Sequence, residues 1–288
     1  DRLLIVGDMS SASGTGQVYS AALIDNVSLR KYYTIPSGSD AAWIKNNLSS
    51  GSATLTNKTL RVAGTLTIDE DFTFEDCNFI MEENAKITVN ANKRLTINNT
   101  DNIAESIKTC DPNEFWDGIY VYGEISIANQ TSPSSNPSIT FSNASNGIVI
   151  KSLQFYYLEN IDFDRNNQAI NFDANGNINS FSIVKGCSFT CSAPLINASG
   201  QDYYPDLAVK LEGAFLTTSP NLIHFDSDYN GRRTHFDGLA GGFSAENSSF
   251  AMHNSDFINF NSFASGFNGL SVRETAIFIT NTSSTPTT

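Results

Sequence analysis

The chain is poor in the residues that build several common sites. Its 288 residues include four Cys, three His, three Met and two Trp. The cysteines form no C-x-x-C pair and the histidines are scattered, which argues against a zinc site. No run of 18 apolar residues occurs, so no membrane-spanning helix is expected. With 17 basic against 30 acidic residues, the formal charge of −13 repels a phosphate backbone and argues against a nucleic-acid partner.

Several signatures of enzymes are also missing. The sequence contains no G-x-S-x-G nucleophile turn and no G-x-x-x-x-G-K phosphate loop. A polysaccharide lyase needs a basic residue to remove a proton, but no R-x-P-x-x-R arrangement occurs. A β-helical glycosidase would combine "NTD" with "DD" and "GHG", and only "NTD" at 99–101 is present. We interpret that isolated match as a turn.

The residues that are present alternate. The stretch "EDCNFIMEENAKITVNANKRLTINNTD" at 75–101 places apolar side chains two residues apart in short runs separated by Asn-rich segments. Such alternation predicts strands with one buried face, and the intervals are too short for a crossover helix. Similar runs continue to the end of the chain, for example "GIYV", "SITF", "AINF" and "FSIV". The pattern predicts an all-β fold with frequent sharp turns.

The runs also recur at longer range. The segments that open at Gly147, Ala169 and Gly269 resemble one another, and the interval between coils is an irregular 20 to 30 residues. A period that contains two or three strands and no helix is typical of a β-solenoid, in which each coil stacks on the previous one. A two-sheet sandwich is the alternative. We favour the solenoid because N-G pairs precede strands and do not join paired ones.

The pattern divides the chain into three parts. Residues 1–58 are expected to form an N-terminal cap and lead-in, with Asp40 as the N-cap of a short helix that ends near Leu48. Residues 59–280 are expected to form the solenoid, with a loop-rich insertion at about 192–242. Residues 281–288 are rich in Ser, Thr and Pro and predict a linker or truncated tail. The start lacks an initiator Met, which we interpret as processing or trimming.

The four cysteines allow two interpretations. Cys187 and Cys191 flank Phe189 with even spacing, so all three side chains are expected on one face of a strand, with the sulfurs too far apart to bond. The cysteines can be buried as small hydrophobic residues. Alternatively, a disulfide forms, with Cys110 in a loop as one partner.

The segments "GTLTIDEDFTFEDCNFIMEENAKITVNANKRLTINNTD" and "FWDGIYVYG", followed by "VKLEGAF" and "GLAGGFSAENSSFAMHNSDFINFNSFASGFNGLSV", carry a resemblance. Over about residues 60–275 the chain resembles secreted right-handed parallel β-helix proteins of Bacteroidota, which are often exported by the type IX route. The resemblance implies a right-handed parallel β-helix and an extracellular or cell-surface location. The C-terminal sorting domain of those proteins is not present in this sequence.

The sharpest local motif is "DSDYNGRRTHFD" at 226–237. It puts oxygen-bearing side chains at positions one, three, five and twelve of an EF-hand-like loop, with Gly231 at position six. The ligands would be Asp226, Asp228, Asn230 and Asp237. Hard oxygen ligands at this spacing suit calcium, whereas the two adjacent arginines weaken the pattern. A solvated turn stays open as the alternative.

Two functional hypotheses follow. The first is a noncatalytic structural or adhesive surface protein that self-associates into a filament, sheath or matrix, since a solenoid has open ends and repetitive faces. The second is a carbohydrate-active lyase or glycosidase, or a glycan-binding β-helix, with residues 201–237 as the place to look. There, Tyr203 and Tyr204 are candidates for stacking on a sugar ring. Neither hypothesis requires a cofactor, and calcium is the one ion considered.

Overall fold

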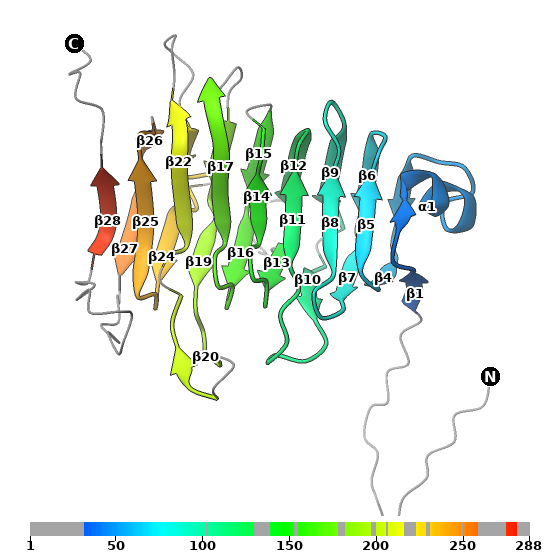
Figure 1. The fold of residues 1–288 in the computed structure, drawn as a ribbon, viewed down its shortest axis with the longest axis horizontal. Coiled ribbons are helices and arrows are strands. Elements are labelled where there is room, and N and C mark those ends of the chain that lie inside the picture. The colour runs from blue at the N-terminus through cyan, green and yellow to red at the C-terminus, as the bar shows by residue number, and fades with distance from the viewer. Residues whose placement is uncertain are drawn as a thin grey trace, which may run out of the picture. The chain divides into compact units, whose positions relative to one another are not determined.

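The computed structural model describes residues 32–101, 103–129, 139–152, 155–177, 182–196, 200–205, 207–215, 223–228, 231–248, 250–258 and 275–280. Within them, almost all regular structure is β-strand, and three large sheets run along the stack (Figure 1). Every strand pairing inside these three sheets is parallel. The prediction of an all-β parallel solenoid is therefore confirmed.

The three sheets are named A, B and C here. Sheet A contains β1 (Tyr32–Ile35), β4 (Thr59–Val62), β7 (Asn78–Met81), β10 (Glu105–Thr109), β13 (Ile139–Ser142), β16 (Ile161–Asp164), β19 (Ser188–Thr190), β24 (Thr234–Asp237) and β27 (Ser255–Ile258). Sheet B contains β2 (Ser39–Asp40), β5 (Thr65–Ile68), β8 (Lys86–Val89), β11 (Gly118–Val121), β14 (Ile148–Ile150), β17 (Ile170–Asn177), β22 (Val209–Phe215), β25 (Gly241–Glu246) and β28 (Thr275–Thr280). Sheet C contains β3 (Thr54–Thr56), β6 (Phe72–Glu75), β9 (Arg94–Asn99), β12 (Glu124–Asn129), β15 (Tyr156–Glu159), β18 (Ser182–Lys185), β23 (Ile223–Asp226) and β26 (Phe250–Met252).

The chain visits the sheets in the fixed order A, B, C and then returns to A one rung further along. Each strand therefore pairs with the strand three places later, as β4 does with β7 and β5 with β8, and the insertion after β19 is the exception to this numbering. This is a right-handed parallel β-helix. Rungs differ in length because the loops between strands differ, so the sequence period is irregular although the pairing is regular.

Inward side chains form columns that continue from rung to rung. In sheet A, Phe141, Phe163, Phe189, Phe236 and Phe257 occupy matching positions on successive strands. Their ring centroids are separated by 5.3, 5.2, 4.7 and 4.5 Å along the column. Such contacts add about 0.5–1.5 kcal/mol per aromatic pair to the burial of the rings. The column explains why the sequence repeats Phe at strand centres.

The corner between sheets C and A is made by single residues in the left-handed region. Five rungs turn here with φ between 46° and 56°, at Asn57, Asp76, Asn160, Gly186 and Asn254. Asn, Asp and Gly tolerate this conformation better than other residues. The backbone N–H of Asp76 donates to the Asn98 carbonyl on the next rung at 2.9 Å, so the corner is also hydrogen-bonded along the stack.

The N-terminal rung carries the one α-helix of the described residues. Helix α1 (Ala41–Asn47) begins after Asp40, whose side chain accepts a hydrogen bond from the Trp43 N–H at 2.7 Å. It buries Ala41 and Ile44 and lies at the blue end of the stack (Figure 1). The predicted N-cap and the end of the helix near Leu48 are confirmed.

The coil begins earlier than the sequence predicted, and it continues through the loop-rich segment as expected. Strands β1 to β3 lie within residues 1–58, so part of the expected cap is already the first rung. In the expected insertion at 192–242, a short antiparallel hairpin of β20 (Leu195–Ile196) and β21 (Asp202–Tyr203) projects below the stack (Figure 1). Strands β22, β23 and β24 then continue the regular sheets. Residues 281–288 lie outside the described residues.

Candidate functional site

Three carboxylates meet at the corner between sheets C and A. One oxygen each of Asp76, Asp101 and Glu105 lies within 4.8 Å of the other two. Asp76 is the corner residue between β6 and β7, and the other two belong to the next corner, between β9 and β10. Because β6 pairs with β9 and β7 with β10, the two corners are stacked neighbours. We call these three residues the acidic corner.

Hydrogen bonds within the loops fix two of the three side chains. The Asp76 carboxylate accepts from the backbone N–H and the hydroxyl of Thr100 at 2.6 and 2.7 Å. The Asp101 carboxylate accepts from the N–H of Ile103 at 2.9 Å. The Asn99 side-chain amide donates to the Ile103 carbonyl at 2.6 Å, which closes the same loop. Both carboxylates are thus held in place by the turn that connects the rungs.

Glu105 is different because it points into the core. It is the first residue of β10, in an alternating burial pattern, and it is 3% exposed. Its partner on the next rung is the buried Ile139. No described residue forms a hydrogen bond with its Oε2 atom. Burial, together with the charges of Asp76 and Asp101, raises the pKa of the Glu105 carboxyl to about 9.

The nearest thiol does not join this group. The Cys77 Sγ donates to the carbonyls of Glu75 and Leu55, at 3.3 and 3.4 Å. Burial raises the pKa of the Cys77 thiol to about 12, so it stays protonated at neutral pH. The ligand atoms that converge at the acidic corner are therefore all oxygens, a set that suits a hard cation.

The predicted calcium loop lies further along the stack, at the same side of it. Asp226 ends β23 and Asp237 ends β24, on different sheets, and Asn230 lies outside the described residues. The Asp228 carboxylate accepts from the Arg232 N–H at 2.6 Å. Among the described residues, the acidic corner is the only set of three acidic, His or Cys side chains that converges within 4.8 Å. Calcium binding at 226–237 remains a prediction.

Side chains from other rungs form hydrogen bonds and ion pairs with residues of that loop. Asn254 donates to the Asp226 carboxylate at 3.0 Å. Arg232 forms an ion pair with Asp162, and Arg233 forms one with Asp256 at 2.9 Å. The two arginines that weakened the calcium motif therefore link the loop to neighbouring strands.

The two predicted sugar-stacking tyrosines are partly buried. Tyr203 belongs to β21 and pairs with Leu195 in the projecting hairpin. Tyr203 and Tyr204 both pack against the hydrophobic core. Binding of a sugar by these rings remains a prediction.

All four cysteines are free thiols. Cys77, Cys187 and Cys191 are buried, and Cys110 is exposed. Phe189, between the latter pair of buried thiols, is buried as well, which confirms the predicted common face. The interpretation of buried cysteines as small hydrophobic residues therefore holds for three of the four.

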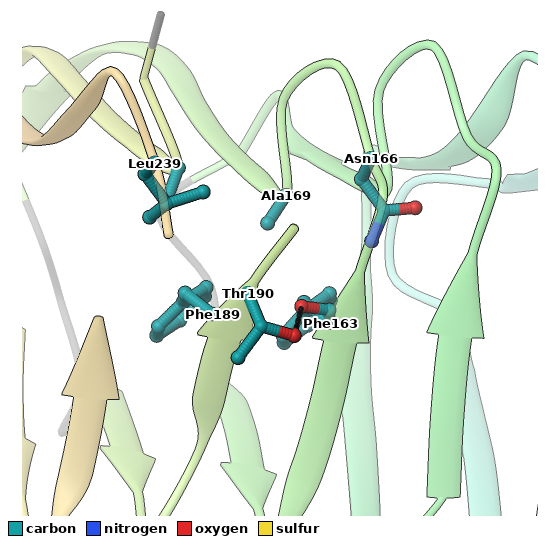
Figure 2. Close-up of a pocket in the computed structure, with 7 residues that line it drawn as sticks. Phe163, Asn166, Ala169, Phe189, Thr190 and Leu239 are labelled. Atoms are coloured by element: carbon teal, nitrogen blue, oxygen red, sulfur yellow. Dashed lines mark hydrogen bonds between the residues drawn. The ribbon is translucent and has the colours of Figure 1, made fainter. Parts of the chain in front are cut away.

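A small cavity lies between sheet A and the loops that lead to sheet B (Figure 2). It is lined by Phe163, Asn166, Ala169, Phe189, Thr190, Ala208 and Leu239. The volume within which the centre of a water molecule can lie is about 10 Å³. This is about the space that one water molecule needs. A sugar ring does not fit there, so we interpret it as a packing gap.

Comparisons with known proteins return no relatives. No family model matches the chain, and no curated protein or solved structure is significantly similar to it. Among the described residues, no helix has the length and apolar character needed to cross a bilayer.

Sequence reasoning missed the acidic corner. The "NTD" at 99–101 was interpreted as a turn. Asn99 is the last residue of β9, and Asp101, at the corner that follows, meets two carboxylates from other positions. A signal was present in "ESIKT" at 105–109, where the alternation of Glu105, Ile107 and Thr109 places a carboxylate on the buried face. A charged residue at an inward position of a strand is costly without a partner, and this makes it a useful marker.

Proposed function

We propose that this chain is a noncatalytic extracellular protein with a structural or adhesive role, and that copies of it associate through the ends of the β-helix. The observation that carries the proposal is the continuous stack of paired strands with in-register inner columns. Such a stack holds its outer faces in fixed positions over many rungs, which suits a scaffold or a binding surface.

The end of the stack supports self-association. Within the described residues, β26, β27 and β28 each have a strand neighbour on one side only. An edge strand with free N–H and C=O groups is a template for pairing with another chain. At the other end, β1 is likewise the outer strand of sheet A. Because all pairings in the stack are parallel, a second copy could continue the sheets head to tail.

The region first considered for carbohydrate chemistry supports the noncatalytic role. A lyase uses a Lys or Arg base together with a cation that neutralises the uronate carboxylate. Here Arg232 and Arg233 are both held in ion pairs with aspartates of other strands. His235 lies 3.7 Å from the Asp237 carboxylate. The two arginines are therefore engaged in contacts between rungs, and His235 lies near a carboxylate of its own strand.

The proposed location is outside the cell or on its surface. It is supported by the resemblance of residues 60–275 to exported β-helix proteins of Bacteroidota, with the type IX route as the proposed export path. Cell-surface or matrix glycans are proposed partners alongside other copies of the chain. The inner columns, not disulfides, hold the described rungs together, since all four cysteines are free.

The test is to measure association and turnover with the same preparation. We expect sedimentation velocity to show a concentration-dependent increase in mass, and electron microscopy to show linear assemblies. Ile258→Lys places a charge at the end of β27, where Ile258 is 42% exposed, and should weaken association at least about tenfold. Ile196→Lys is the matched control, because Ile196 is 41% exposed in the projecting hairpin.

Three results would contradict the proposal. A monomer at all accessible concentrations, with no binding to glycans or matrix, would remove its basis. Equal weakening by both Lys substitutions would show that the edge of β27 is not the contact. Release of unsaturated or reducing sugars from a polysaccharide would favour the carbohydrate-active alternative.

A further inference from the structure

The acidic corner concentrates negative charge without a visible counter-charge. Its three carboxylates come from Asp76, Asp101 and Glu105, on two stacked corners of the helix. None of the ion pairs formed by the described residues includes any of them. Among the described residues, the hydrogen-bond donors to the group are the neutral groups of Thr100 and Ile103. Three close carboxylates with only neutral donors repel one another.

Glu105 gives a second and separate indication of a ligand. A Glu side chain that is 3% exposed has lost its hydration, and no described residue compensates by a hydrogen bond to its Oε2 atom. A buried ionised carboxylate without a partner costs several kcal/mol. The following rungs of the same column carry apolar residues at this position, Ile139 and Ile161. A Glu at this buried position is explained if its Oε2 atom binds a ligand.

The ligand atoms suit a hard cation, and their separations are within the reach of Ca²⁺. Ca²⁺–oxygen distances of about 2.3–2.6 Å allow two ligand oxygens up to about 4.6–5.2 Å apart, whereas Mg²⁺ at about 2.0–2.1 Å allows about 4.0–4.2 Å. The oxygens of the acidic corner lie within 4.8 Å of one another. The Cys77 thiol is engaged by two backbone carbonyls, so no sulfur ligand converges with the oxygens.

We propose that Asp76, Asp101 and Glu105 bind one Ca²⁺ ion, with water and backbone carbonyl oxygens completing the coordination. The ion would join the corner between β6 and β7 to the corner between β9 and β10, and so fasten consecutive rungs. It would also neutralise the one carboxylate of the group that faces the core. This site is distinct from the loop at 226–237.

The experiment uses the full 288-residue chain, treated with EGTA and then dialysed. Calorimetric titration with CaCl₂ should give one ion per chain at the acidic corner. Thermal unfolding should shift upward by about 5 °C at a Ca²⁺ concentration 100 times the Kd. MgCl₂ should produce a clearly smaller shift at equal concentration, because Mg²⁺ demands near-ideal octahedral geometry and gives up its water ligands reluctantly.

Variants assign the site. Glu105→Gln keeps the shape and removes the charge, and it should abolish the Ca²⁺-dependent shift. Asp101→Asn, at a partly exposed position, should weaken Ca²⁺ binding at least about tenfold and serves if the buried variant does not fold. Glu124→Gln is the matched control, because Glu124 lies on the neighbouring β12 and pairs with Arg94. It should bind Ca²⁺ as the parent chain does.

Asp228→Asn separates the two candidate calcium sites. It keeps a side-chain acceptor for the Arg232 N–H, so the loop should stay folded. If Asp228→Asn abolishes the Ca²⁺ shift and Glu105→Gln preserves it, the acidic corner is not the site. An equal response to Mg²⁺ would overturn the choice of Ca²⁺. No saturable binding up to about 10 mM, ten times the weakest affinity of extracellular calcium modules, would show that a proton alone neutralises the corner.

Discussion

Two acidic segments lie at the corner between sheets C and A, and the pKa values of their carboxyl groups shift in opposite directions. At the end of β23, burial works to raise the pKa of Asp226, but hydrogen bonds from Asn254 and the Ser227 N–H outweigh it and hold that pKa below its usual value. At the acidic corner, burial of Glu105 has no such compensation, and its pKa rises to about 9. Burial and hydrogen-bond donors together decide the difference. Glu105 is 3% exposed, whereas Asp226 is only partly buried and accepts hydrogen bonds from Asn254 and Ser227.

The comparison also shows that spacing along the sequence is a poor guide to which side chains converge in a solenoid. The 226–237 motif has the intervals of a calcium loop, yet Asp226 and Asp237 end strands of two different sheets. The acidic corner has no recognisable interval, since Asp76 precedes Asp101 and Glu105 by a whole rung. Stacking brings those residues together. In this fold, residues one rung apart are closer neighbours than residues a few positions apart.

The largest expected effect concerns the pH dependence of the acidic corner. Without Ca²⁺, the pKa of Glu105 lies above its ordinary 4.5, so the folded state binds the proton more tightly than the unfolded state. Its stabilising contribution is complete below about pH 4.5 and is lost as the pH rises towards about 9. The free energy of unfolding should fall by up to about 1.4 kcal/mol per pH unit in this window.

Urea unfolding in EGTA at several pH values measures this slope, and Glu105→Gln isolates it from other titrating groups. The difference between parent and Glu105→Gln should be steep between pH 5 and pH 9, whereas the stability lost in Asp226→Asn should be present at neutral pH and should disappear as the pH falls below about 3.8. A parallel pair of profiles for the parent chain and Glu105→Gln would mean that Glu105 is not buried as described.

A second prediction tests how tightly the 226–237 corner is packed. Gly186 turns the corner between β18 and β19, one rung earlier, at φ 56°, and a Cβ there would meet Asn160 Oδ1 at 2.6 Å and the Asp228 Cβ at 2.9 Å. Gly231, within the 226–237 loop, has φ 83° and nothing within 4 Å of a built Cβ. Both Ala variants bear the left-handed backbone strain of about 1–2 kcal/mol. Gly186→Ala should lose at least about 1 kcal/mol more, because only it also clashes.

Chemical denaturation of the two single variants gives this difference directly. Equal losses of unfolding free energy at Gly186 and Gly231 would show that the corner can relax around an added methyl group. In that case, Gly186 would not be more tightly packed than Gly231.

The smallest expected effect concerns the reactivity of the four cysteine thiols. Cys77 directly follows the corner residue Asp76, and Cys187 directly follows the corner residue Gly186. Burial raises the pKa of both thiols to about 12. We expect one thiol per native chain, that of the exposed Cys110, to react rapidly with a disulfide reagent, and four after denaturation. Cys110→Ser should remove the fast reaction with little change in stability, and a second fast thiol would contradict the described burial.

The local features were accessible from the sequence because each depends on neighbouring residues. The alternation of Ile87 and Val89 specified a half-buried strand, and Asp40 specified the start of a helix. The expected cap boundary at residue 58 was too late because β1 to β3 are short and only weakly alternating. Their membership of the stack is established by pairing with later rungs.

The sequence by itself determined that this protein is a parallel β-helix with apolar and aromatic inner columns, because a period of two and the recurrence of short runs are encoded locally. The tertiary structure alone decided which side chains share a corner. Asp76, Asp101 and Glu105 meet because loops of unequal length end in the same register, and the hydrogen bonds between strands, not the number of intervening residues, set that register. The tertiary structure therefore also decides whether a buried carboxylate is paired with a hydrogen-bond donor or with a cation.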